Sequence, residues 1–139
     1  MSETNDCLFC TIVEGDVAAE TLIETDTVTS FLDINPVNPG HALVLPRRHA
    51  ETLPELRQNE LHSVIFTVQR ISRAVVQATE ADGFNVLQNN NPVAGQEIPH
   101  VHFHVIPRFE DDGFQLGWRQ GSYQDGEIEV IRDNIMQHL

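Results

Sequence analysis

The sequence predicts an α+β domain in which an antiparallel sheet of about five strands packs against one long helix, with a second helix at the C-terminus. The 139 residues fit one globular domain spanning 1–139. Apolar residues recur at helical spacing over one long segment, residues 51–79. The other apolar runs are short and are bounded by Pro, Gly or Asn, as strands commonly are.

Five short segments have the length and composition of strands: 21–24, 28–32, 41–45, 84–88 and 100–106. The intervening segment 35–40 holds two prolines and a glycine, which predict an irregular loop. Pro46 and Pro107 follow two of the runs, and we expect them to end the third and fifth strands because proline cannot donate to a sheet.

The long helix should begin near Thr52, which forms a capping-box pattern with Glu55. Its apolar stripe should pack on the sheet and consists of Leu61, Val64, Ile65, Val68, Ile71 and Val75. Residues 111–126 are rich in glycine and predict an irregular segment, within which we expect Trp118 to pack into the core. Residues 127–139 predict a helix with one apolar face made of Ile128, Ile131, Ile135 and Leu139.

Charge narrows the function classes. The net charge is −13, from 21 acidic residues and eight basic residues that are all arginine. Such a surface repels phosphate chains, so we expect no polymeric nucleic acid as a partner. The bias and the absence of lysine predict a halophilic protein whose thermal stability rises as KCl is raised to molar levels; the alternative is an ordinary acidic protein of a mesophile, and unchanged or falling stability would favour it.

Hydropathy predicts the compartment. No stretch of ~20 apolar residues is present, so we expect no membrane span. Residues 1–10 are polar and acidic, unlike a secretion signal. A cytoplasmic protein is the expectation.

Two cysteines, Cys7 and Cys10, have the spacing C-x-x-C. A disulfide between them would close a very short loop and stabilise little. Redox activity and metal binding are the two interpretations that remain for the pair.

Three histidines alternate with apolar residues in His100–Ile106. On a strand, one face would carry His100, His102 and His104. The other face would turn Val101, Phe103 and Val105 into the core. A row of imidazoles could bind a metal. Alternatively, a neutral histidine could attack phosphorus while a protonated neighbour holds the developing charge.

The row resembles the signature of the histidine-triad (HIT) superfamily. Further blocks resemble the same family in order and spacing: Phe31–Pro36, Pro39–His49, Gly83–Val86 and Ala94–Pro99. Cys7–Cys10 resembles its bacterial and archaeal branch. The resemblance covers about residues 7–108, and the tail, 109–139, lies outside it.

The resemblance implies catalytic roles for four residues. His102 would attack the α-phosphorus of a nucleotide conjugate and form a nucleotidyl-histidine that water then hydrolyses. Its other ring nitrogen would donate to the main-chain carbonyl of His100. His104 and Gln96 would contact the α-phosphate, and His41 would lie near the leaving group.

The resemblance also implies a nucleotide-binding set. Asp33 would accept the ribose hydroxyls, Phe31 and Ile34 would line the base pocket, and Asn89 would position the phosphate together with Gln96, His102 and His104. Taken singly, Asp33 could cap a loop and Asn89 could be turn chemistry alone.

Two positions bear on the chemistry around the phosphate. Glu97 stands where the phosphoramidases of the family usually have serine or threonine, so it could relay a proton, repel phosphate or simply face solvent. Arg108 offers local compensation of phosphate charge.

The resemblance further implies a structural Zn²⁺ bound by Cys7, Cys10, His49 and His100, with no metal needed for the chemistry. This set requires His100 to point away from His102 and His104. Members of the family are mostly homodimers that pair through the long helix and a sheet edge, and we expect the same here.

The predicted function is therefore hydrolysis or transfer of a purine nucleotide group, with a nucleoside monophosphate as product. A dinucleoside polyphosphate hydrolase and a nucleoside phosphoramidase are not separated by the sequence. The alternatives are a non-catalytic nucleotide-binding protein of the same fold, and a domain whose histidine row binds metal.

Overall fold

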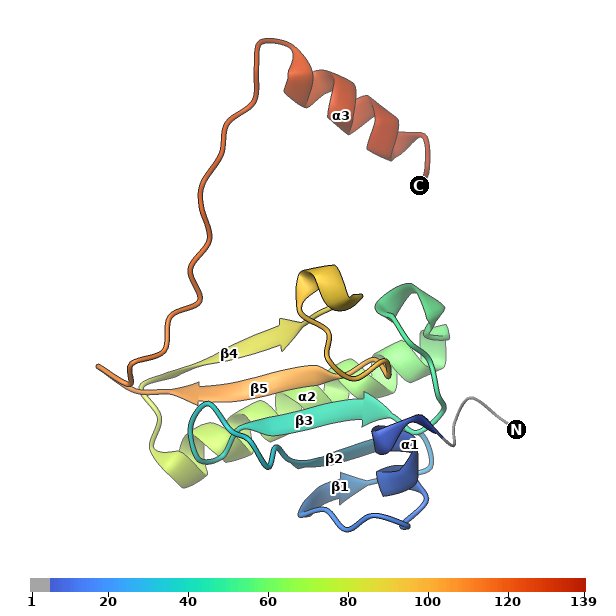
Figure 1. Ribbon diagram of the computed structural model, residues 1–139, viewed down its shortest axis with the longest axis vertical. Helices are drawn as coiled ribbons and strands as arrows, with labels where there is room; N and C mark the ends of the chain where they lie inside the picture. Colours follow the sequence, from blue (N-terminus) through green and yellow to red (C-terminus); the bar gives the residue numbers. More distant parts are fainter. Residues whose placement is uncertain (1–5) are drawn as a thin grey trace.

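The computed structural model describes residues 6–139, and a five-stranded antiparallel sheet is its centre. The strands are β1 (Thr21–Glu24), β2 (Val28–Leu32), β3 (Ala42–Pro46), β4 (Gly83–Gln88) and β5 (Phe103–Arg108). Their order is β1-β2-β3-β5-β4, and every neighbouring pair is antiparallel (Figure 1). The predicted α+β class and the five strands are confirmed.

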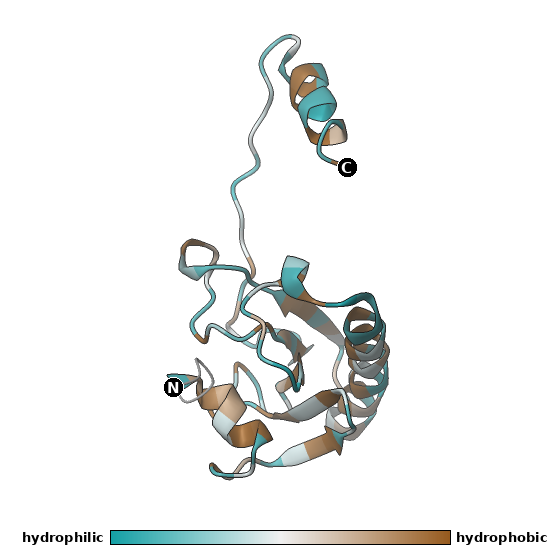
Figure 2. Cartoon of the chain, turned by 90° about the vertical axis from the view of Figure 1, so that its right-hand side faces the viewer, coloured by the Kyte–Doolittle hydropathy of each residue, from teal (hydrophilic) through white to brown (hydrophobic). Residues whose placement is uncertain are grey.

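The two faces of the sheet carry different partners. Helix α2 (Gln58–Thr79) covers one face, and the short helix α1 (Leu8–Val13) lies on the other (Figures 1 and 2). Alternation along β3 explains both layers: Ala42 and Val44 join the cluster under α2, while Leu43 and Leu45 join the cluster under α1. On β5, Phe103 and Val105 likewise pack under α2. His104, which lies between them, therefore faces the α1 side.

Helix α2 begins later than expected. Thr52 and Glu55 do form a capping interaction, with the Thr52 N–H donating to Glu55 Oε2 at 2.7 Å, but it belongs to a separate 3-10 helix, Leu53–Glu55. Leu56 is extended, with ψ of 138°, which ends that helix before α2 starts at Gln58. The buried stripe of α2 includes Val64, Val68, Ile71 and Val75, whereas Leu61 and Ile65 are exposed.

The triad strand is displaced from its predicted range. β5 starts at Phe103, so His100 and His102 precede it, although Val101 is buried as expected. Pro107 lies within β5 because β3 pairs with β5 only as far as Val105. The missing N–H of Pro107 therefore costs no hydrogen bond between strands.

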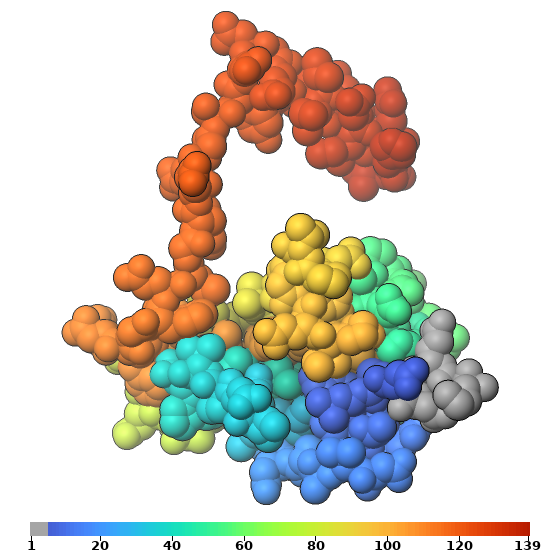
Figure 3. Space-filling view, in the orientation of Figure 1, coloured from blue at the N-terminus to red at the C-terminus, as the bar shows by residue number. Residues whose placement is uncertain are grey.

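The C-terminal arm, residues 115–139, leaves the body of the molecule. After a segment without regular structure, α3 (Glu127–Met136) stands apart beyond the β4 edge (Figures 1 and 3). Trp118 is 81% exposed, so the expectation that it packs into the core is wrong. The apolar residues of α3 are exposed as well, including Ile128, Ile131 and Ile135. None of the helices described here is long and apolar enough to cross a membrane.

An ion pair between Arg48 and the buried Glu60 lies at the start of α2 and makes stability depend on pH. Arg48 donates to both oxygens of Glu60 at 2.8 Å, and Glu60 is buried. Hydrogen bonding from Arg48 lowers the pKa of Glu60. The pair therefore stabilises the fold above the unfolded-state pKa of ~4.3, and this contribution is lost as the pH falls through the lower folded-state pKa.

Glu60→Gln should lower the free energy of unfolding at neutral pH by about 1–2 kcal/mol, and the difference from wild type should vanish in acid. Urea unfolding across pH measures this, with the exposed Glu129→Gln as the matched control. A deficit that persists unchanged below about pH 3 would show that Glu60 acts through packing instead.

Candidate active site

A pocket of about 410 Å³ opens on the sheet face opposite α2. Its walls come from α1, the strand ends of β2 and β3, the loop before β5, and Phe114. The lining includes Phe31, Asp33, Ile34, Asn89, His41, His102 and His104. The fold therefore brings together all the residues expected to bind or attack a nucleotide except Gln96. The volume of the pocket is in the range of small-ligand sites.

His102 has a fixed orientation and a free ring nitrogen. Its Nδ1 lies 2.7 Å from the main-chain carbonyl oxygen of His100, so Nδ1 carries the proton and donates. Nε2 is consequently left with a lone pair. Phe9 packs edge-on against the imidazole, with ring centroids 5.0 Å apart, and only 7% of His102 is exposed. The geometry is that of a preorganised nucleophile.

His41 and His104 form a hydrogen-bonded pair whose proton positions the backbone sets. The Val37 N–H donates to His41 Nδ1 at 3.0 Å, which makes that nitrogen an acceptor. His41 Nε2 therefore carries the proton and donates to His104 Nδ1 at 2.9 Å. His104 in turn must carry its proton on Nε2. His104 is thus an N–H donor on the same side of the sheet as His102.

The same arrangement decides against a metal at this point. Asp33, His41 and His104 place one potential ligand atom each within 4.8 Å of one another. A neutral imidazole binds a metal through a lone pair, however, and the Val37 N–H already occupies the lone pair of His41 Nδ1. His41 Nε2 then bears a proton and cannot be a ligand. Hydrogen bonding is the better account of this group.

Burial keeps the three histidines that line the pocket neutral. It lowers the pKa of His104 to about 4, with His102 and His41 adding to the effect, and it also lowers the pKa values of His41 and His102. A neutral His102 retains its nucleophilic lone pair at pH 7. The protonated neighbour considered from the sequence is replaced by a neutral N–H donor on His104.

The loop entering His41 is shaped by a glycine. Gly40 has φ of +100°, and a Cβ there would lie 2.7 Å from Cγ2 of Thr79. Only glycine fits both the backbone conformation and the space. Asp33, at the start of this loop, accepts the Asn35 N–H at 2.9 Å with Oδ1, while Oδ2 lies 3.6 Å from His41 Nε2.

Gln96 and Arg108 do not have the roles expected of them at the phosphate, and the structure gives the position of Glu97. The Gln96 amide donates to the Glu51 carbonyl at 2.7 Å and accepts the Asn91 N–H at 2.7 Å, so it braces the loop and does not line the pocket. Arg108 pairs with Asp112 at 2.7 Å and does not line the pocket. Glu97 is exposed, but it does line the pocket.

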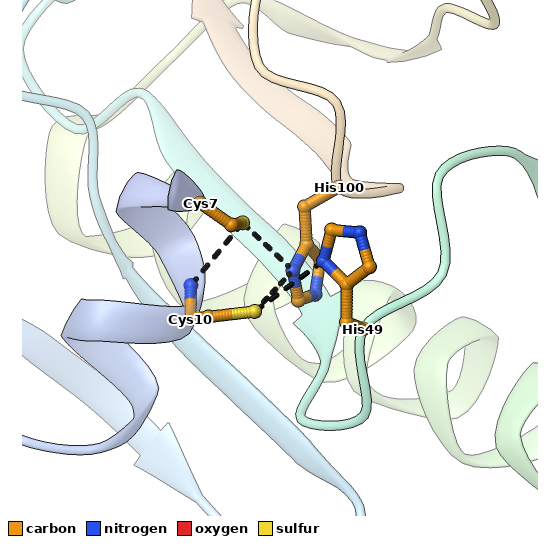
Figure 4. A group of neighbouring side chains, drawn as sticks. All are labelled: Cys7, Cys10, His49 and His100. Atoms are coloured by element: carbon orange, nitrogen blue, oxygen red, sulfur yellow. Dashed lines mark hydrogen bonds between the residues drawn. The ribbon is translucent and has the colours of Figure 1, made fainter. Parts of the chain in front are cut away.

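Beside this pocket, the two cysteines and two histidines meet in a second cluster (Figure 4). Cys10 Sγ lies 3.3 Å from His49 Nδ1 and 3.5 Å from His100 Nδ1, and Cys7 Sγ lies 3.4 Å from His100 Nδ1. Tetrahedral zinc, with bonds of ~2.3 Å to sulfur and ~2.0 Å to nitrogen, places such atoms about 3.5 Å apart. The donor set and its spacing therefore fit Zn²⁺.

The surroundings of His100 also suit a metal. Its Nε2 lies 2.8 Å from the Pro46 carbonyl oxygen, so Nε2 donates and Nδ1 presents its lone pair to the sulfurs. The ring points toward the cysteines, while the carbonyl of the same residue holds His102. The expectation that His100 shares a face with His102 and His104 is therefore wrong, because the Pro46 carbonyl and the two cysteines hold its ring in the second cluster.

Several residues of the site carried no signal in the sequence. Phe9 belongs to a helix that the cysteine spacing did not predict, Val37 contributes only its backbone N–H, and Phe114 comes from the irregular tail. A backbone donor and a wall residue from a distant segment become visible only once the chain is folded.

Comparisons with known proteins agree with this fold. The family model of the HIT domain matches residues 14–111. The adenosine 5'-monophosphoramidase of Schizosaccharomyces pombe is 38% identical over 134 residues, which cover 96% of this chain and 98% of that protein.

Solved structures match as well. A HIT family protein from Bacillus subtilis has a TM-score of 0.91 at 35% identity, covering 96% of this chain and 97% of that one. A Zn-bound histidine triad family protein from Mycobacterium smegmatis has a TM-score of 0.74 at 32% identity, covering 97% and 96%. The chain belongs to the HIT family.

Proposed function

We propose that this protein hydrolyses purine nucleoside 5'-phosphoramidates, releasing a nucleoside monophosphate and an amine through a nucleotidyl-His102 intermediate. The observation that carries the proposal is the pairing of His102 Nδ1 with the His100 carbonyl, which leaves Nε2 as the attacking atom. The name of the S. pombe relative, an adenosine 5'-monophosphoramidase, supports the substrate class.

In the first step, the lone pair of His102 Nε2 forms a bond to phosphorus and the phosphorus–nitrogen bond to the amine breaks. The amine leaves with that electron pair and takes up a proton from solvent. The His100 carbonyl stabilises the positive charge that develops on the His102 ring. The Nε2–H of His104 donates to a phosphoryl oxygen as its charge increases.

In the second step, water attacks the same phosphorus and loses a proton to solvent as the bond to His102 Nε2 breaks. The nucleoside monophosphate is released, and His102 regains its lone pair. Asp33 accepts the ribose hydroxyls, and Phe31 and Ile34 contact the base, which holds phosphorus in line with the nucleophile.

The charge of the pocket favours an amine over a polyphosphate as leaving group. Asp33 and Glu97 line the pocket, and none of its lining residues in the described part of the chain is Lys or Arg. A dinucleoside polyphosphate would bring several negative charges to carboxylates without a compensating cation. A neutral or cationic amine meets no such repulsion.

Release of AMP from adenosine 5'-phosphoramidate and from diadenosine tetraphosphate tests the proposal. We expect kcat/KM to be about tenfold or more greater for the phosphoramidate, and Glu97→Gln to narrow that ratio. Glu110→Gln, which removes an exposed carboxylate outside the pocket, is the control. AMP binding without turnover of either compound would favour the non-catalytic nucleotide-binding alternative.

We also propose that the second cluster binds structural Zn²⁺ through Cys7, Cys10, His49 and His100. The fit of the four donors to a tetrahedral site and the Zn-bound relative from M. smegmatis support this assignment. When bound, the metal would hold the N-terminal segment and His100 in place, and no step of the reaction requires it.

A homodimer is proposed on the evidence of two surfaces. β4 is an edge strand with Phe84 and Val86 exposed, and beside it an apolar groove runs along Ile65, Val68 and Val76 of α2. The C-terminal arm stands beyond this edge (Figure 1). The match to the B. subtilis structure covers 96% of this chain, so it includes part of the C-terminal arm.

A second copy at the β4 edge would occupy the space between β4 and α3. Deletion of residues 115–139 should therefore weaken self-association, measured by sedimentation equilibrium against the full chain. A full chain that sediments as a monomer at all concentrations would contradict the proposed dimer.

A further inference from the structure

We propose that Asp112 is a positioning residue for the site. Through Asn38 it keeps the proton of His41 on Nε2, and through Phe114 it holds one wall of the nucleotide pocket. The inference concerns the geometry of the pocket, and its kinetic consequence rests on the proposed function. Asp112 lies in the tail segment where no functional residue was expected.

Asp112 is the centre of a dense set of contacts. Its side chain is 7% exposed. Oδ2 accepts from Arg108 Nε at 2.7 Å, Asn38 Nδ2 at 2.9 Å and the Phe109 N–H at 3.1 Å. Oδ1 accepts from Arg108 Nη2 at 2.9 Å and the Phe114 N–H at 3.1 Å. The carboxylate thus joins β5, the tail and the loop before β3.

The contact with Asn38 reaches the catalytic histidines. Asn38 Nδ2 donates to Asp112 and also to the Pro107 carbonyl at 2.9 Å, which fastens the loop to the end of β5. The Asn38 carbonyl accepts the His41 N–H at 3.0 Å. The preceding residue, Val37, supplies the N–H that keeps His41 Nδ1 an acceptor.

Loss of this fastening would free the proton of His41. If the Val37 N–H moves away, His41 can place its proton on Nδ1 and leave a lone pair on Nε2. That lone pair would then face the lone pair of His104 Nδ1, which now lies 2.9 Å away. The pair would separate or exchange protons, and His104 would no longer be held as an Nε2–H donor.

The contact with Phe114 sets the pocket wall. Asp112 Oδ1 holds the Phe114 N–H, and the Arg108 guanidinium both donates to the Phe114 carbonyl and lies 4.8 Å from the centre of its ring. Arg108 is itself fixed by Asn85 Oδ1 at 2.8 Å. Phe114 and Val37 both line the pocket, so one carboxylate is connected to two of its lining residues.

Asp112→Asn tests the inference, because an amide keeps the size but cannot accept all the donors around it. Asp111→Asn is the matched control: Asp111 is exposed and has φ of 57°, a conformation that asparagine tolerates. We expect Asp112→Asn to lower kcat for adenosine 5'-phosphoramidate about tenfold, raise KM, and alter the pH profile of kcat. Asp111→Asn should match wild type.

Imidazole ¹⁵N chemical shifts give a readout that does not depend on activity. Wild type should show His41 with its proton on Nε2, and Asp112→Asn should show a mixture of the two tautomers. If Asp112→Asn does not fold, Asn38→Ala breaks the same connection, leaves the Arg108–Asp112 pair intact, and should give the same mixture.

The outcomes separate the two proposals. A wild type that releases no AMP contradicts the proposed function, and the His41 shifts still decide the role of Asp112. A folded Asp112→Asn or Asn38→Ala variant that keeps the wild-type His41 tautomer, kcat and KM overturns the inference.

Discussion

His102→Ala is expected to eliminate AMP release from adenosine 5'-phosphoramidate, lowering kcat by a factor on the order of 10⁴ or more. The reason is that His102 Nε2 is the lone pair that the His100 carbonyl and Phe9 hold toward the pocket. No other group replaces it: burial and hydrogen bonding have committed His41 Nδ1 and His104 Nδ1 to accepting hydrogen bonds.

Affinity for AMP should change far less than kcat, because in the proposed mechanism His102 acts chiefly by bonding to phosphorus. Stopped assays for kcat and calorimetric titration with AMP measure the two effects separately. His62→Ala, which removes an exposed histidine of α2, is the control and should keep the wild-type rate. A His102→Ala protein that retains more than a few per cent of wild-type kcat would assign the attack to water instead of His102.

The second large effect is expected at the metal cluster. Cys10→Ser should abolish stoichiometric zinc and lower the free energy of unfolding by about 3–4 kcal/mol, or roughly 10 °C in Tm. Cys10 is 4% exposed and contacts both histidines of the cluster, so its loss disrupts every pair around it. Burial also raises the pKa of the Cys10 thiol to about 12 in the metal-free protein, so the thiolate form depends on the metal.

Elemental analysis of the purified protein and thermal unfolding measure both effects. Thr11→Ser is the matched control, since it makes a similar change on the same helix and retains the hydroxyl that donates to the Leu8 carbonyl. Cys10→Ser should also reduce kcat, because His100 supplies the carbonyl that orients His102. Full zinc content in Cys10→Ser would rule out the proposed ligand set.

Residue patterns predicted most of the sheet because its strands are short apolar runs bounded by Pro, Gly, Asn or acidic turn residues. β1 and β2 have the predicted bounds, β3 is shifted by one residue at both ends, and β4 begins one residue earlier than predicted. The boundaries of α2 and β5 were missed for local reasons. An extended Leu56 separates two helices, and the end of the β3 pairing permits Pro107 inside a strand.

The site could be predicted where its functional side chains lie close together in sequence or in segments that resemble the HIT family. His102, His104, His41 and Asp33 do meet in one pocket, and the four expected zinc ligands meet beside it. The position of Trp118 could not be predicted. An aromatic side chain favours burial, but the sequence does not say whether the core of the same chain or another surface covers it. The role of Asp112 depends on contacts between segments 74 residues apart.

The acidic composition still awaits its test. Net charge of −13 without lysine predicts stabilisation by molar KCl, and the assays above should therefore be run at high and low salt. The cytoplasmic location expected from the sequence is likewise a prediction.

The most direct test of the account is to trap the covalent intermediate. Wild-type protein mixed with adenosine 5'-phosphoramidate, quenched within a turnover and digested, should yield the peptide containing His100–Ile106 with an adenylyl group on His102. The His102→Ala protein should yield none. Rapid AMP release by wild type with no adduct on His102, or with the adduct on another residue, would contradict the mechanism.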